Sequence, residues 1–128
     1  MIKILLIILF FLVTTPNVYS FPSCDGDEIE VSGVVIKKTF PGPPNYESIE
    51  NGDKAETCWF IVLEKSISFS PDGVFISKEV VVNKLQLVKS NYKFIEGKKY
   101  LIKGVTFPGH TGHHHSTVLL EVNSVKEL

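Results

Sequence analysis

Residues 97–107, Gly-Lys-Lys-Tyr-Leu-Ile-Lys-Gly-Val-Thr-Phe, decide the fold that this sequence predicts. Gly97 marks a turn, and the apolar residues after it indicate a β-strand. A loop rich in histidine and a further apolar segment, 117–125, follow. A strand, a loop and a closing strand in this order are typical of the second half of an OB-fold, a small Greek-key barrel. The sequence therefore predicts an all-β fold, a five-stranded OB-like Greek-key barrel with at most one short helix.

The other predicted strands are short apolar runs that lie between turns rich in glycine and proline. They are residues 29–38, 57–64, 67–70, 74–76 and 80–88. Gly33, in the middle of the first run, predicts a bulge or a sharp bend. Residues 91–96 are expected to form a helical turn that ends at Gly97. A small open β-sandwich of similar size is the alternative architecture.

Residues 1–20 have the three parts of a secretory signal peptide. These are a positive start at Lys3, an apolar run over residues 4–13, and small or aliphatic residues before a break after Ser20. The run is shorter than the roughly 20 residues that a bilayer span needs. We therefore expect residues 21–128 to form a single exported domain that is periplasmic or secreted.

Charge and motif content exclude some classes of function. Without Lys3, the part after the signal peptide has 12 lysines against 14 acidic residues, and it has no arginine. Nucleic-acid binders usually carry a basic surface on which arginine contacts phosphate and guanine, so the composition argues against nucleic acid as a partner. The sequence also has no nucleophile motif and no phosphate-binding glycine loop. A protein without enzymatic activity is therefore favoured.

The two cysteines, Cys24 and Cys58, are predicted to form a disulfide, because an even number in an exported domain favours pairing. Closing this loop would stabilise the fold by roughly 3–4 kcal/mol in the chain-entropy model. The alternative is a lipid-modified Cys24. The two hypotheses exclude each other, since an acylated thiol cannot pair.

The longest polar stretch, residues 39–56, is called the Pro-rich loop here. Its three clustered prolines restrict the backbone and predict a stiff loop, which lowers the entropy cost of binding. Its aromatic and polar side chains are candidate ligand-binding residues: Phe40, Asn45, Tyr46, Glu47, Asp53 and Glu56. The alternative is a rigid connector whose aromatic rings cover the open end of the barrel.

Residues 107–117, called the His-rich loop here, contain all four histidines of the chain. Thr111, His113 and His114 are candidate ligand-binding residues. His113 and His115 would face the same way on an extended backbone, and His110 could complete a site for Zn²⁺, Cu²⁺ or Ni²⁺. The alternatives are a solvated polar turn and a pH sensor.

In an OB-like barrel, the Pro-rich loop and the His-rich loop would flank one ligand-binding face. The leading hypothesis is therefore an exported binding module whose site is formed by both loops. A glycan, a small molecule or a segment of an envelope protein could be the ligand. The alternative is a metal-binding protein or a metal-dependent hydrolase that uses the histidines.

Three stretches together resemble a family of short exported bacterial domains that is described only as a domain of unknown function. They are residues 39–49 (Thr-Phe-Pro-Gly-Pro-Pro-Asn-Tyr-Glu-Ser-Ile), Gly52-Asp53 with Glu56, and residues 111–115 (Thr-Gly-His-His-His). The resemblance spans about residues 30–126 and implies that the two loops form the functional face. It implies no activity, substrate or metal. His110 and Cys24 lie outside the pattern that matches.

Overall fold

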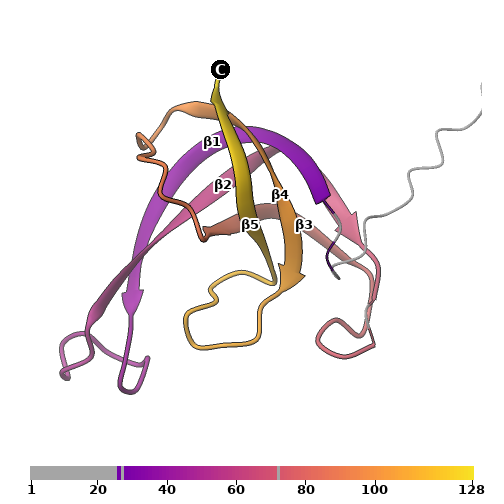
Figure 1. The fold of residues 1–128 in the computed structure, drawn as a ribbon. Coiled ribbons are helices and arrows are strands. Elements are labelled where there is room, and N and C mark those ends of the chain that lie inside the picture. The colour runs from indigo at the N-terminus through magenta and orange to yellow at the C-terminus, as the bar shows by residue number, and fades with distance from the viewer. Residues whose placement is uncertain (1–25, 27, 72) are drawn as a thin grey trace, which may run out of the picture.

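Five strands form a closed barrel (Figure 1). They are β1 (Glu28–Pro41), β2 (Ala55–Phe69), β3 (Val80–Val88), β4 (Lys99–Pro108) and β5 (Val118–Glu127). The computed structural model describes residues 26, 28–71 and 73–128. The strand order is β1-β2-β3-β5-β4, and β4 pairs with β1 to close the barrel. The β3–β5 pair is parallel and the other pairs are antiparallel. The predicted all-β, five-stranded barrel is therefore confirmed.

The described residues contain no helix of the length and apolarity that crossing a membrane would require.

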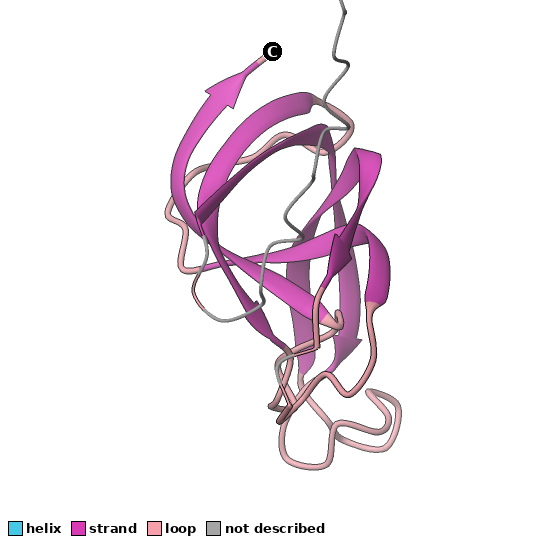
Figure 2. Cartoon of the chain, turned by 90° about the vertical axis from the view of Figure 1, so that its right-hand side faces the viewer, coloured by secondary structure: helices cyan, strands magenta, loops and turns pink. Residues whose placement is uncertain are grey.

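Strand β1 belongs to two strand pairs, which overlap at Gly33. Its first half pairs with β4, and the half that starts at Gly33 pairs with β2. A Cβ atom on Gly33 would collide with the backbone carbonyl of Val62 on β2, so only glycine lets the two strands approach this closely. Strand β1 arches over the barrel in Figure 1, and Figure 2 shows the strands arranged around one interior.

The two faces of each strand follow the period of two that a β-sheet imposes. On β2, Trp59 and Ile61 pack into the interior, whereas Cys58 and Phe60 lie on the other face. The interior is filled by aliphatic and aromatic side chains: Val31, Val35, Ile61, Leu63, Phe69, Ile76, Val82, Leu85, Leu87, Phe94, Tyr100, Ile102, Val118 and Leu120. This filled interior leaves the outer face and the loops as the places where a ligand could bind.

A buried row crosses the outer face of the barrel. Phe60 on β2, Gln86 on β3 and Leu119 on β5 are in register with one another. All three are buried, although none belongs to the interior cluster. The side chain of Gln86 hydrogen-bonds the backbone of the His-rich loop, so that loop lies against the outer wall at this row.

Three local predictions need correction. Residues 57–64 and 67–70 form one continuous strand, because β2 passes through a register shift between Val62 and Ile67 and stays paired with β3. Residues 74–76 do not form a strand. Residues 91–96 form no helical turn, since Phe94 is buried against Tyr100 and the backbone N–H of Ile95 donates to the Tyr100 hydroxyl at 2.9 Å. The predicted signal peptide, residues 1–20, lies outside the described residues.

Candidate functional site

The Pro-rich loop and the His-rich loop meet at one end of the barrel (Figure 1). The hydroxyl of Tyr46 lies 3.1 Å from Nε2 of His113. Glu56, at the start of β2, contacts Nδ1 of His113 with one carboxylate oxygen and Nε2 of His115 with the other at 3.0 Å. Residues that are more than fifty positions apart in the sequence therefore form one cluster, with Glu56 at its centre.

Asp53 holds the Pro-rich loop together. It is buried, and its carboxylate accepts hydrogen bonds at 2.9 Å from the backbone N–H groups of Asn45, Glu47 and Ser48. These hydrogen bonds lower the pKa of Asp53 below its ordinary value, because they stabilise the charged form. Of the predicted binding residues, Asp53 and Asn45 therefore build the loop, while the side chain of Glu47 is exposed.

Tyr46 reaches the second loop because two backbone features bring it there. Its own φ of 56° is in the left-handed region, which turns the chain sharply at this residue. On the other side, a Cβ atom on Gly112 would lie only 2.9 Å from Cζ of Tyr46. The absence of a side chain at Gly112 thus allows the tyrosine ring to pack directly against the His-rich loop.

Two of the four histidines hold the backbone of their own loop. Nδ1 of His114 accepts hydrogen bonds from the backbone N–H groups of His110 and Thr111 at 2.9 and 3.2 Å. Burial and the nearby His110 lower the pKa of His114, which favours the neutral imidazole that can accept. The side chain of His110 donates to the carbonyl of Pro108 at 2.9 Å. Thr111 accepts from the backbone N–H of His113 through its hydroxyl at 3.3 Å.

The structure therefore separates the three histidines that were predicted to bind a metal. His113 and His115 both point to Glu56, whereas His110 lies against Pro108, His114 and Phe75. The three histidines do not converge on one point.

His115 is held on two sides by residues of the barrel. Its ring stacks on Phe40 of β1 with a centroid separation of 3.9 Å and an interplanar angle of 3°. Its backbone N–H donates to Oε1 of Gln86 at 2.5 Å, and Nε2 of Gln86 donates to the carbonyl of His113 at 2.9 Å. Sequence reasoning missed Gln86, because a polar residue between Leu85 and Leu87 also fits an ordinary alternating strand with one exposed face.

Glu56 is ionised within this cluster. Burial acts to raise its pKa, but hydrogen bonds from His115 and His113 outweigh that effect and lower it. Because a carboxylate only accepts, the histidine nitrogens that face it must carry protons. When the His113 ring is neutral, its Nε2 accepts a hydrogen bond from the Tyr46 hydroxyl. The cluster thus links Tyr46 through His113 to Glu56.

Cys58 lies two residues after Glu56 on the same face of β2. Its thiol is buried and free in the structure, and the predicted partner Cys24 lies outside the described residues. The structure therefore does not show the predicted disulfide. Burial and the negative charge of Glu56 raise the pKa of Cys58 to about 11. The ligand atoms of Glu56, Cys58 and His115 all lie within 4.8 Å of one another.

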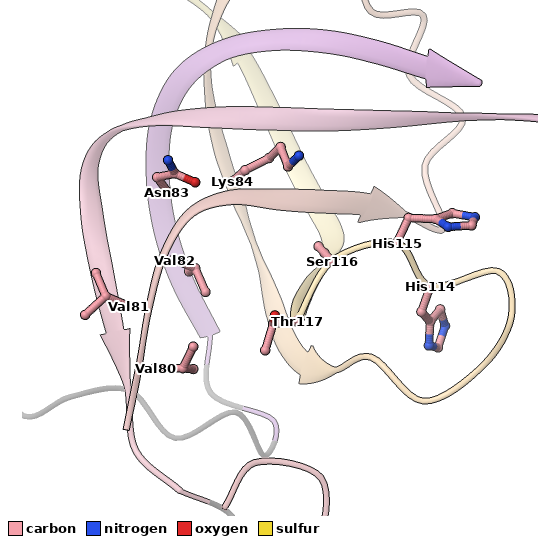
Figure 3. A pocket seen from close by; sticks show the side chains of 9 residues that line it. All are labelled: Val80, Val81, Val82, Asn83, Lys84, His114, His115, Ser116 and Thr117. Atoms are coloured by element: carbon pink, nitrogen blue, oxygen red, sulfur yellow. The ribbon is translucent and has the colours of Figure 1, made fainter. Parts of the chain in front are cut away.

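A pocket of about 510 Å³ adjoins the cluster (Figure 3). Residues 80–84 of β3 form one wall, and residues 114–117 of the His-rich loop form the other. Lys84 lines the pocket, and its Nζ lies 5.1 Å from the centroid of the Phe60 ring. Burial and the nearby Lys38 lower the pKa of Lys84. His115 is shared, since it lines the pocket and also contacts Glu56.

Comparison with known proteins shows that part of this chain is similar to one family. Residues 76–126 match the family model described as a domain of unknown function (DUF4431). This confirms the predicted resemblance to a domain of unknown function over the segment that contains β3, β4 and the His-rich loop. The Pro-rich loop lies outside the matched residues. No curated protein and no solved structure matches the chain.

Proposed function

We propose that this domain is a non-enzymatic, exported binding module that takes an anionic ligand in the pocket between β3 and the His-rich loop. The pocket carries the proposal. Its volume of about 510 Å³ falls in the range of roughly 300–1,000 Å³ that small-molecule sites occupy. Valines of β3 supply an apolar wall, and Lys84, His115 and Ser116 supply polar groups that could fix the orientation of a ligand.

Two lysines favour an anion over a neutral ligand. Burial lowers the pKa of Lys84, and repulsion from the nearby ammonium group of Lys38 lowers it further. Neither lysine forms an ion pair with an acid among the residues that the structure describes. A carboxylate or phosphate bound beside Lys84 in the pocket would offset this repulsion. A small organic acid, a glycan with an acidic sugar, and an acidic segment of an envelope protein all offer that group.

The two loops beside the pocket are held in place by contacts within the protein. Asp53 holds the Pro-rich loop, Gln86 and His114 hold the His-rich loop, and Glu56 joins the two loops. A site that is already ordered loses less conformational entropy on binding. This supports binding, rather than a solvated turn, as the role of the loops.

Amide chemical shifts measured by NMR would test the proposal. The probes are citrate, inorganic phosphate and oligogalacturonate, each compared with a neutral sugar of similar size. At least one anion should shift the amides of residues 80–84 and 114–117, and the neutral sugar should not. Lys84→Gln should abolish the shifts, whereas Lys89→Gln, which alters an exposed lysine paired with Glu121, should leave them unchanged.

Two results would contradict the anionic ligand. In one, none of the three anions shifts these amides. In the other, Lys84→Gln and Lys89→Gln have the same effect on the shifts, which would mean that the anions bind to surface charge in general.

A further inference from the structure

The geometry points to a second site next to the pocket: Glu56, Cys58 and His115 bind one Zn²⁺ ion or a similar transition-metal ion, with His113 or water as the fourth ligand. This inference goes beyond the proposed function and does not depend on it. It involves neither Lys38 nor Lys84.

The three ligand atoms already lie near the spacing that a metal needs. They are within 4.8 Å of one another. In a tetrahedral zinc site with bonds of about 2.0–2.3 Å, the ligand atoms are roughly 3.5 Å apart. Closing the site therefore needs no pair to approach by more than about 1.3 Å, which small side-chain rotations supply.

The donor set selects the class of metal. A thiolate, an imidazole and a carboxylate are the three side-chain types that bind Zn²⁺ in proteins. A thiolate donor disfavours Mg²⁺ and Ca²⁺, which prefer oxygen ligands. The site is half-enclosed, because Cys58 is buried and the side chains of Glu56 and His115 are 22% and 15% exposed. An ion could enter from the solvent side, where His113 lies.

The ligands are also fixed in orientation by their neighbours. Glu56 and Cys58 are at positions i and i+2 of β2 and so lie on one face of a paired strand. Phe40 stacks on the His115 ring, and Gln86 binds the His115 backbone. Metal sites in proteins rely on such outer contacts to orient their ligands. Contacts within the protein therefore place the Cys58 thiol beside the His115 imidazole and the Glu56 carboxylate.

This set differs from the one that the histidines alone predicted. His110 is replaced by Cys58 and Glu56, because the His110 side chain is turned toward the carbonyl of Pro108. A disulfide between Cys58 and Cys24 would remove one ligand, so the metal site and the predicted disulfide exclude each other. Binding must also release the Cys58 proton, since the thiolate is the ligand.

Cobalt titration of the reduced protein tests the site directly. Residues 21–128 are purified without a His-tag, and mass spectrometry verifies that both thiols are free. Co²⁺ should bind at one ion per chain and give a thiolate-to-metal charge-transfer band together with the visible bands of a tetrahedral site. Zn²⁺ should then displace it.

Variants assign the ligands. Cys58→Ser should remove the charge-transfer band, and both Cys58→Ser and His115→Ala should weaken Zn²⁺ binding by at least about 100-fold, the upper range seen for mere outer-shell partners. His110→Ala is the matched control, in the same loop and of the same residue type, and should bind as the unmodified protein does. If Cys58→Ser does not fold, as circular dichroism would show, Glu56→Gln takes its place with the same expected loss of affinity.

The inference is wrong if Cys58→Ser keeps the charge-transfer band, since Cys24 would then be the thiolate. It is also wrong if His110→Ala weakens binding as much as His115→Ala, which would indicate a loose histidine cluster at the surface. Absence of any Zn²⁺ binding by the reduced protein would likewise overturn it.

Discussion

The Pro-rich loop and the His-rich loop contain side chains with the same two roles, but the two loops are anchored differently. Each has a side chain that holds its own backbone, Asp53 in one and His114 in the other. Each also reaches across to its neighbour, through Glu56 and through His115. The Pro-rich loop is anchored by a charged group within itself. The His-rich loop has a neutral imidazole and depends in addition on Gln86 of the barrel wall.

This difference shows that the four histidines have two separate roles. His110 and His114 keep the loop in shape, and His113 and His115 make contact with Glu56. The barrel wall decides which histidines contact Glu56, because Gln86 fixes the backbone at residues 113 and 115. The predictions that follow test this division from the largest expected effect to the smallest.

Gln86→Leu should have the largest effect on stability. It leaves the N–H of His115 and the carbonyl of His113 without their partner, and each unsatisfied buried group costs about 1–3 kcal/mol. We expect a loss of roughly 2–3 kcal/mol in the free energy of unfolding, measured in urea. Asn83→Leu, at an exposed position of the same strand, should change it by less than about 0.5 kcal/mol. Equal losses in the two variants would mean that Gln86 does not anchor the loop.

Asp53→Asn should have the next largest effect, and it should depend on pH. Hydrogen bonds from the backbone lower the pKa of Asp53, so its contribution to stability is present above the ordinary value of 3.8 and is lost as the pH falls through the lowered pKa. The variant should therefore be less stable than the unmodified protein at about pH 7, and the difference should shrink toward about pH 2. Thermal unfolding across this range would measure it. A difference that does not change with pH would contradict the assigned role.

A comparison of His114→Ala with His114→Asn should show whether His114 stabilises the loop as a hydrogen-bond acceptor or through packing of its ring. Alanine leaves the N–H groups of His110 and Thr111 to water and should cost about 1 kcal/mol. Asparagine places an oxygen where Nδ1 stands and should recover most of that loss. The free energy of unfolding of the two variants checks this. If they lose the same amount, the acceptor is not what His114 supplies.

Much of the fold could be predicted from the sequence because strands leave local signals. The alternation of residues 80–88 located β3. The merging of two runs into β2 could not be predicted, since the register shift near Val62 depends on pairing with β3. The predicted helical turn before Gly97 failed because ring packing of Phe94 against Tyr100 sets the backbone there.

The site was predicted only at the level of loops. OB-like topology predicted that the two loops would flank one face, and the structure brings Tyr46 and His113 into contact. Which histidines face Glu56 could not be predicted, because Gln86 and Phe40 decide it through tertiary contacts. Cys58 was interpreted only as a disulfide partner. The Glu-x-Cys spacing on one strand face was the signal that would have placed it beside Glu56.

A double-mutant cycle between Glu56→Gln and His115→Ala tests most directly that Glu56 links the two loops. In metal-free protein, the free energies of unfolding should show a coupling of about 0.5–1 kcal/mol, as for contacting residues that are partly buried. The matched cycle between Glu56→Gln and His110→Ala should be additive to within about 0.3 kcal/mol. Additivity in both cycles would contradict the link between the loops.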